Sequence, residues 1–335
     1  MKKKAGFLLL VLTLVTLVLA GCSSKTGNTG SDSASAKLKT VKIANYSGAV
    51  CFAPLYAAVE KGFFTQEGLN VELVRTDFEG TKEGLATGKI DATLGLFHKW
   101  VKPIEQGMDI KFTAGLHTGC IQVVAGNNSG ITRVEDLRGK RVGVDAIGAG
   151  PMNLLAVALS RAGIDWKNEV TWRAYPPDQL EAALDKGEID AVAITDPYGQ
   201  FIIDKNKGRL ILSQAETEPY ARDYCCFVAV SGKLIAKDKE TAAALTRALM
   251  KASMWVNENR EEAARLGVEK KYTGGTAEGN ARLLAKYHYV PGVQAAREAF
   301  LKAVKDLKAA GILEVDRPET LVEKAFVPVT GEITQ

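Results

Sequence analysis

The chain has 335 residues, of which 46% are hydrophobic and 24% are charged, proportions typical of a globular protein long enough for two lobes of roughly 100–200 residues each. The formal net charge is +4, but three of these charges are Lys2, Lys3 and Lys4 at the very start of the chain. The remaining chain is close to neutral, which argues against nucleic acid or another strongly charged surface as its partner.

The first 22 residues have the pattern of an export signal. The three lysines precede an apolar run over residues 5–20, which is shorter than the ~20 apolar residues that span a bilayer comfortably. The run ends in Leu-Ala-Gly-Cys, which resembles the lipobox of bacterial lipoproteins, whose cysteine is lipidated and becomes the mature N-terminus. We therefore expect a signal peptide over residues 1–21 and lipidation of Cys22. The alternative is a single anchor helix with an incidental cysteine.

The segment that follows reads as a tether. Residues 22–37, from the expected lipidated cysteine onward, are mostly small and polar, so they are too poor in apolar side chains to form a core. We expect an extracytoplasmic protein that is attached to the cell membrane through the Cys22 lipid. The sequence contains no second hydrophobic span, so the chain is not expected to be a channel or permease itself.

After the tether, short apolar runs alternate with helical patterns, which predicts an α/β fold with largely parallel sheets. A first series has a strand at 41–45, a helix at 54–60, and strands at 71–74, 92–96 and 110–116. A second series has a strand at 141–144, a helix at 151–161, and strands at 170–174, 191–194 and 210–212. From Lys233 onward the pattern is mostly helical, with amphipathic stretches at 241–257, 277–287 and 293–310.

One short segment occurs twice. Residues 85–92 read LATGKIDA and residues 184–191 read LDKGEIDA, at corresponding places in the two series. Each copy is expected to be the end of a helix, a glycine in the left-handed C-cap conformation and the entry to a strand. The repeat favours two lobes of related design, with ligands bound beyond the carboxyl ends of the strands.

Three further motifs carry a family resemblance. They read GFFTQEGLNV at 62–71, GKIDA at 88–92 and VEDLRGKRVGV at 134–144. Together they resemble the nitrate, sulfonate, taurine and thiamine-precursor (NMT1/THI5-like) group of substrate-binding proteins of ABC transporters. The resemblance covers roughly residues 38–313 in order.

This resemblance implies a periplasmic-binding-protein-like fold, in which two α/β lobes joined by a two-strand hinge enclose a ligand cleft. Lobe 1 would be discontinuous, at 38–124 plus 224–335, and lobe 2 would occupy 125–223. The implied partners are a small-molecule ligand and an ABC permease with its ATPase. We expect a monomer that is not an enzyme, with no cofactor and no nucleic acid.

Two loops are candidates for contact with the ligand. Gly148, Gly150 and Pro151 lie between a predicted strand and helix, where free N–H groups and the helix dipole favour an anionic or polar group. A tight turn without a ligand is the alternative. Ser47 and Gly48 lie in the matching loop of the first lobe, where related receptors contact ligand.

Three polar residues follow predicted strand ends. Asp196 stands where related receptors often have an acidic residue before a proline and an aromatic residue. It is expected either to pair with a cationic or N–H-bearing ligand group or to cap the next helix. His98 follows the matching strand of the first lobe, and His117 ends the strand before the crossover. We include both histidines in the predicted site, although a lone histidine is more often structural.

The cysteines depart from the family pattern. Cys51, Cys120, Cys225 and Cys226 all map around the expected cleft, and exported cysteines commonly pair, so one or two disulfides are expected. Neighbours along a strand point to opposite faces, so only one of Cys225 and Cys226 should face the cleft. We place Cys51, Cys120, Tyr224 and Cys225 in the predicted site. With the histidines they have the ligand types of a soft-metal or metalloid site, but no tight spacing supports one, and we assign no metal ligand. Buried free thiols are an equal alternative.

An enzyme of the same fold is the remaining alternative. A yeast-type pyrimidine synthase has a cysteine-rich motif, and Cys225-Cys226-Phe227 is similar to part of it. The chain shows no nucleophile–base spacing and no phosphate-loop pattern, which favours a binding protein. The expected ligand is a small organic molecule of the sulfonate, carboxylate or pyrimidine type.

Overall fold

The structure is a computed structural model that describes residues 38–45 and 48–333. The predicted signal peptide, Cys22, the tether and Ser47 therefore lie outside the described residues. Among the helices that the structure describes, none is long and apolar enough to cross a membrane.

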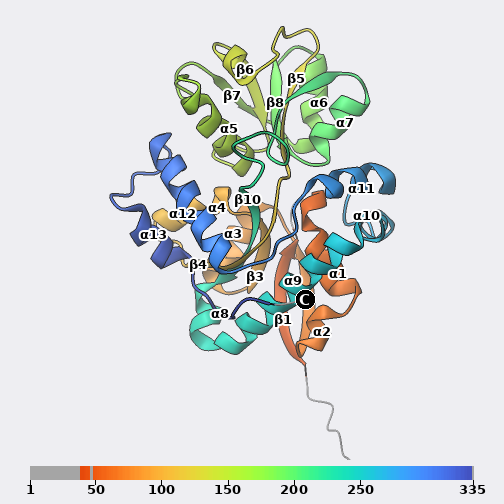
Figure 1. Cartoon of the computed structure of the whole chain (residues 1–335), viewed down its shortest axis with the longest axis vertical. Helices are drawn as coiled ribbons and strands as arrows, with labels where there is room; N and C mark the ends of the chain where they lie inside the picture. Colours follow the sequence, from red (N-terminus) through yellow and green to blue (C-terminus); the bar gives the residue numbers. More distant parts are fainter. Residues whose placement is uncertain (1–37, 46–47, 334–335) are drawn as a thin grey trace, which may run out of the picture. The chain divides into compact units, whose positions relative to one another are not determined.

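Two five-stranded sheets carry the described fold (Figure 1). The first has the order β2-β1-β3-β10-β4, with β1 at Lys39–Asn45, β2 at Leu69–Arg75, β3 at Ala92–Leu96, β4 at Ile110–Thr118 and β10 at Tyr224–Ser231. The second has the order β7-β6-β8-β5-β9, with β5 at Ile121–Gly126, β6 at Arg141–Val144, β7 at Thr171–Ala174, β8 at Ala191–Thr195 and β9 at Gly208–Ser213.

Each sheet contains one reversed strand. In the first sheet β10 pairs antiparallel with both of its neighbours, and in the second sheet β5 does the same. The other strands of each sheet share one direction, so the prediction of largely parallel sheets is confirmed. The reversed direction of β5 and β10 has the same origin in both sheets. Each strand enters its sheet directly after the chain has crossed from the other sheet.

The chain crosses between the sheets twice. It leaves β4 at Thr118 and enters β5 at Ile121, and it returns from β9 at Ser213 to β10 at Tyr224. The first crossing precedes the predicted crossover near Val124, since residues 121–124 already pair with β8. The predicted domain boundaries themselves stay a prediction.

Helices cover both sheets. Those between the first strands are η1 (Val50–Phe52), α1 (Ala53–Glu60), α2 (Phe63–Gln66), α3 (Phe78–Thr87) and α4 (His98–Glu105). Those around the second sheet are η2 (Val134–Leu137), α5 (Gly150–Arg161), η3 (Pro177–Gln179), α6 (Leu180–Asp185) and α7 (Tyr198–Asp204). After β10 come α8 (Gly232–Lys237), α9 (Lys239–Glu258), α10 (Arg260–Glu269), α11 (Ala277–Lys286), α12 (Gln294–Ala309) and α13 (Pro318–Ala325), which confirms the mostly helical C-terminal region.

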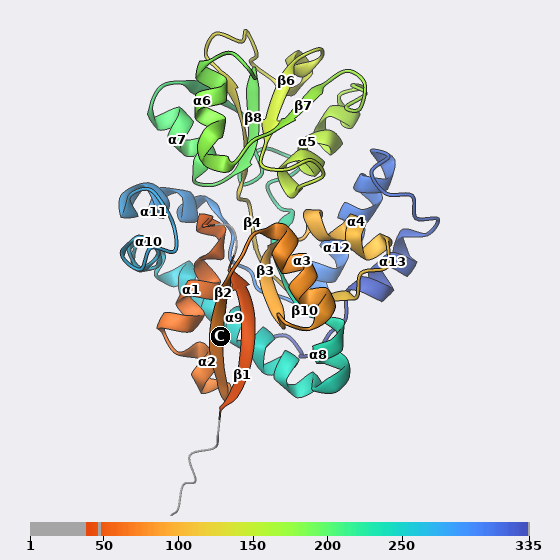
Figure 2. The ribbon, with the colours of Figure 1, turned by 180° about the vertical axis from the view of Figure 1, so that it is seen from behind.

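The C-terminal helices complete the core of the first sheet. The reverse view shows α9 beside α1, and these two helices pack against each other (Figure 2). Phe300 of α12 lies edge-on to Phe112 of β4, with ring centroids 5.1 Å apart, and Phe97 stacks on Phe227 at 4.7 Å. The last third of the chain is therefore part of the same hydrophobic core as the first strands.

The repeated segment forms the same local structure in both sheets. Gly88 and Gly187 both have left-handed backbone angles, with φ of 79° and 66°. The carboxylate of Asp91 accepts a hydrogen bond from the backbone N–H of Lys42 at 2.8 Å, and Asp190 accepts one from Arg141 at 2.8 Å. The expected helix end, C-cap glycine and strand entry are confirmed, and the aspartate in each copy joins two parallel strands.

Asp190 also binds the Arg141 guanidinium through both carboxylate oxygens, at 2.6 and 3.0 Å. We expect Asp190→Ala to lower the free energy of unfolding by about 1–3 kcal/mol, because it removes charge-assisted hydrogen bonds to a partly buried strand. Urea unfolding measures this loss. Glu83→Ala is the control, since the Glu83 side chain is in an exposed ion pair with Lys89 and its loss should change stability by less than about 0.5 kcal/mol. Equal losses for the two variants would contradict this role of Asp190.

Candidate functional site

A cavity of about 300 Å³ lies where the ends of the two sheets meet. Cys51, Phe52, Phe78 and Lys99 line it from segments of the first sheet. Asp145, Thr195 and Tyr198 line it from segments of the second. The volume lies at the lower end of the range of small-molecule sites, so the cavity suits a ligand of modest size.

Strand ends place the polar residues of this cavity. Asp77 follows β2, Asp145 follows β6, and Thr195 is the last residue of β8. Lys99 lies in the first turn of α4, directly after β3. These are the carboxyl ends of parallel strands, where open α/β sheets bind their ligands.

Lys99 and Asp145 carry opposite charges at this cavity. Lys99 is only 7% exposed, and its burial lowers the pKa of the ammonium group, while the negative charge of Asp145 opposes this shift. Burial raises the pKa of the Asp145 carboxyl, and the charge of Lys99 opposes that. The Oδ1 atom of Asp145 is buried and accepts no hydrogen bond from any described residue. The cavity is therefore lined by a cation and by a carboxyl group, one oxygen of which has no hydrogen-bond partner among the described residues.

Aromatic rings form the apolar part of the cavity wall. Phe78 lies below the Lys99 ammonium, which is 4.6 Å from its ring centroid, and packs against Trp100 with ring centroids 4.8 Å apart. Phe52 is fully buried, and Tyr198 is partly buried on the opposite side. Ring faces of this kind suit a flat ligand.

Of the predicted ligand-binding residues that the structure describes, Cys51 lines the cavity and Gly48 is close to it. A Cβ atom on Gly48 would lie 3.9 Å from the Tyr198 hydroxyl. Ser47 lies outside the described residues. A role for these residues in binding stays a prediction.

Gly148, Gly150 and Pro151 of the predicted glycine turn are not part of the cavity lining. The turn itself is as expected, since α5 begins at Gly150 with Pro151 in its first turn. Gly150 packs against Leu96 of the first sheet, where an added Cβ would approach the leucine side chain to 3.1 Å. The N–H of Gly148 lies 3.1 Å from the sulfur of Met152. Gly150 thus forms a contact between the sheets, and the binding of a ligand by Gly148, Gly150 and Pro151 stays a prediction.

The two histidines are buried and differ in their surroundings. Burial lowers the pKa of His98 to about 3, with Lys302 adding to this shift, so its ring lies within reach of charges on α12. Its Nδ1 has no hydrogen-bond partner among the described residues. In His117, Nδ1 lies 2.9 Å from the carbonyl oxygen of Thr118, and Nε2 lies 3.0 Å from that of Cys51. Both ring nitrogens of His117 are therefore occupied by backbone oxygens.

Asp196 forms a contact between the sheets. It is 3% exposed, and its Oδ2 accepts a hydrogen bond from the Tyr287 hydroxyl at 2.6 Å, while its Oδ1 accepts none from the described residues. Its backbone oxygen accepts a bond from Val50 N–H at 3.2 Å. The capping alternative is wrong, because Pro197 holds the N-cap position of α7 and no side chain caps that helix.

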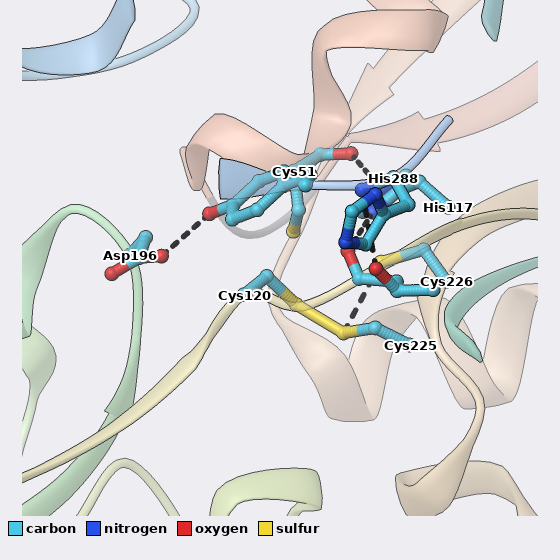
Figure 3. The surroundings of a disulfide bond; sticks show 9 residues. Cys51, His117, Cys120, Asp196, Cys225, Cys226 and His288 are labelled. Atoms are coloured by element: carbon cyan, nitrogen blue, oxygen red, sulfur yellow. Dashed lines mark hydrogen bonds between the residues drawn. A yellow bond between two sulfur atoms is a disulfide. The ribbon is translucent and has the colours of Figure 1, made fainter. Parts of the chain in front are cut away.

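The four cysteines meet where the chain crosses between the sheets (Figure 3). Cys120 and Cys225 form a disulfide, which joins the first crossing to the start of β10. Cys51 and Cys226 are buried free thiols. Both expectations for the cysteines, a disulfide and buried thiols, are therefore present together.

The expectation that Cys225 and Cys226 point to opposite faces of their strand is wrong, and neither residue lines the cavity. Their sulfur atoms lie 3.9 Å apart. The strand pairing shifts register on both sides of Cys226, so the simple alternation of side chains fails there. Tyr224 is buried beside them and donates its hydroxyl hydrogen to the carbonyl oxygen of Val290, away from the cavity lining.

Sequence reasoning missed Lys99, Asp145 and the aromatic wall. Asp145 directly follows a strand that had been predicted, so the rule that ligands bind at strand carboxyl ends was a usable signal for it. The same rule points to Asp77. Phe52 and Phe78 carry no such signal, because apolar residues on helices are usually core.

The chain belongs to the NMT1-like family, whose model matches residues 34–268. It is 29% identical over 266 residues to a Bacillus subtilis (strain 168) protein named "Putative aliphatic sulfonates-binding protein", covering 77% of this chain and 76% of that one. It is 26% identical over 266 residues to the formylaminopyrimidine-binding protein of Halalkalibacterium halodurans, covering 77% of each.

A solved structure shares the fold. The periplasmic nitrate-binding protein NrtA from Synechocystis PCC 6803 matches with a TM-score of 0.73 and 16% identity, covering 87% of this chain and 86% of that one. The predicted periplasmic-binding-protein-like fold is confirmed, and so is the resemblance to this group of proteins.

Asp196 predicts a pH dependence of stability. Burial raises the pKa of its carboxyl to about 7, with the Tyr287 hydrogen bond opposing. Because the pKa of Asp196 is higher in the folded state, its protonated carboxyl stabilises the fold. This stabilisation is complete below the unfolded-state pKa of about 3.9 and is lost as the pH rises through about 7. We expect the free energy of unfolding of the wild type, measured by urea unfolding, to fall by on the order of 1–4 kcal/mol between pH 4 and pH 8. In Asp196→Asn this fall should be absent.

The control for this measurement is Asp178→Asn, because Asp178 is exposed and should keep the wild-type profile. An unchanged pH profile for Asp196→Asn would contradict the role of Asp196.

Proposed function

We propose that the chain is the extracytoplasmic substrate-binding lipoprotein of an ABC importer, which captures a small organic molecule and delivers it to a permease. The observation that carries the proposal is the cavity between the two sheets, with Lys99 on one side and Asp145 on the other. The named relatives bind small molecules, and the family membership supports the same class of function for this chain.

The charges around the cavity favour one ligand class among those expected from the sequence. Asp77, Glu79 and Asp145 contribute carboxylates, against the one ammonium of Lys99 that lines the described cavity. This balance disfavours a bare anion such as a sulfonate or nitrate. A flat nitrogen heterocycle of the aminopyrimidine type fits better, because its N–H groups can donate to Asp145 and its ring can stack on the aromatic wall.

Closure of two lobes around the ligand completes the proposed mechanism. The lobes are proposed at 38–124 plus 224–335 and at 125–223, with the two crossings as the hinge. Contacts between helices α5 and α12 support a closed arrangement, including the ion pair of Arg161 with Asp306 at 2.8 Å. A ligand that binds the closed form more tightly shifts the population toward it, and a permease can then recognise that form.

Binding rather than catalysis is the proposed activity. The enzyme alternative needs a base beside a cysteine nucleophile, and His117 is the histidine that contacts the backbone of Cys51. Because both of its ring nitrogens face carbonyl oxygens, His117 is poorly placed to remove a proton from the thiol. This geometry supports binding without catalysis, and we further propose a monomer that works with a permease and its ATPase.

Binding measurements test the ligand class. We expect an aminopyrimidine to raise the melting temperature of the full-length protein, and taurine and nitrate to leave it unchanged. Calorimetry should show at least tenfold weaker binding for Lys99→Met and for Asp145→Asn, a loss of about 1.4 kcal/mol or more. The matched control is Lys186→Met, an exposed lysine outside the cavity.

Binding of taurine or nitrate in place of the aminopyrimidine would overturn the proposed ligand class, whereas the proposed location of the binding site would still stand. Unchanged affinity in both cavity variants would place the site elsewhere.

Membrane attachment has its own test. We expect Cys22→Ala to leave an unprocessed or mislocalised precursor, because the thiol is the lipid acceptor. Labelling of cells with radioactive palmitate, followed by purification of the protein, measures the attached lipid. Labelling that the substitution does not reduce would reject the lipoprotein assignment.

A further inference from the structure

Three cysteines from distant parts of the chain bring their sulfur atoms together. The Sγ atoms of Cys51, Cys120 and Cys226 all lie within 4.8 Å of one another, and all three residues are buried. Cys51 belongs to η1, Cys120 to the first crossing and Cys226 to the start of β10. The folding of the chain therefore creates this sulfur cluster, which no local sequence spacing indicates.

The spacing of the cluster matches that of a three-coordinate thiolate site. Metal–sulfur bonds of about 2.3 Å at trigonal angles place the sulfur atoms about 4 Å apart. The sulfur–sulfur distances, which are at most 4.8 Å, need to shorten by less than an ångström to reach this geometry. Soft thiolate ligands select thiophilic cations over hard ones such as Mg²⁺ or Ca²⁺.

The surroundings of the cluster supply charge, and the sulfur of Cys225, which lies 3.9 Å from that of Cys226, becomes a further thiol beside it once the disulfide is reduced. His117 contacts Cys51, but its two ring nitrogens face carbonyl oxygens and are not directed at the sulfur atoms. Burial and the neighbouring Cys51 raise the pKa of the Cys226 thiol, and the positive charge of Lys99 opposes this shift. A divalent cation with three thiolates carries one negative charge, which the Lys99 ammonium balances.

We propose that Cys51, Cys120 and Cys226 form a binding site for one soft cation when the disulfide between Cys120 and Cys225 is reduced. Reduction by a dithiol transfers two electrons and two protons to the disulfide and converts the dithiol to its own disulfide. The cation then replaces three thiol protons, which are released to solvent. The site is distinct from the proposed binding site of an organic ligand, although Cys51 borders both sites and the charge of Lys99 acts on both.

Cys225 controls the site without belonging to it. While the Cys225 sulfur is bonded to Cys120, Cys120 is not available as a thiolate, and the free thiols of the described residues are Cys51 and Cys226. Adjacent cysteines in one strand therefore have opposite roles. Replacing Cys226 removes a ligand, whereas replacing Cys225 releases Cys120 from the disulfide and keeps all three ligands.

This difference gives a matched pair of variants for the test. Full-length protein in detergent is treated anaerobically with a water-soluble phosphine, which becomes a phosphine oxide as the disulfide is reduced, and is then titrated with Cd²⁺ alone. Sulfur-to-cadmium charge-transfer absorption and elemental analysis measure binding. We expect one tightly bound Cd²⁺ per chain in the reduced wild type and in Cys225→Ser. We expect at least tenfold weaker binding in Cys226→Ser, in Cys51→Ser and in the unreduced wild type.

Circular dichroism melting shows which variants are folded, and Cys51→Ser serves if Cys226→Ser does not fold. Retention of the charge-transfer band in a folded Cys226→Ser or Cys51→Ser variant would overturn the proposal. Loss of the band in Cys225→Ser, or equal binding by the unreduced wild type, would also overturn it. Binding of the aminopyrimidine is measured separately and does not decide these outcomes.

Discussion

The fold depends on the chain crossing between its two sheets at the end where the parallel strands finish. Each crossing leads into a reversed strand, β5 in the second sheet and β10 in the first, which runs between parallel neighbours. The crossings and the strand carboxyl ends therefore share one region. That region collects the cavity, the contact of Asp196 with Tyr287 and the disulfide between Cys120 and Cys225.

Burial of charge in this region links the fold to the proposed function. Lys99 and Asp145 lose hydration at the cavity, and each is partly compensated by the opposite charge of the other. A buried carboxylate oxygen without a partner is unfavourable in the unliganded protein. In the proposed function, a ligand that donates a hydrogen bond to Asp145 relieves this cost and thereby favours the closed arrangement of the two sheets.

Much of the fold was predictable because local patterns and the repeat agree. The strands at 92–96 and 141–144 match the structure at both ends, and the repeat around Asp91 and Asp190 correctly indicated two related sheets. The candidate site was predicted less well. Ligand binding at the glycine turn stays a prediction, and the packing of Gly150 against Leu96 could not be foreseen, because the closeness of two segments 54 residues apart depends on how the sheets meet.

The sequence by itself determined the α/β class, the family, the repeat and the types of residue that lie near the crossings, because these follow from periodicity and short motifs. Tertiary structure alone decided which of those residues touch. It paired Cys120 with Cys225, brought Cys51 and Cys226 to the same cluster, and placed Lys99 at a cavity with Asp145. The physical reason is that these contacts join segments far apart in the chain. Their distances depend on strand register, and a shift in the pairing around Cys226 turned two neighbouring sulfur atoms toward each other.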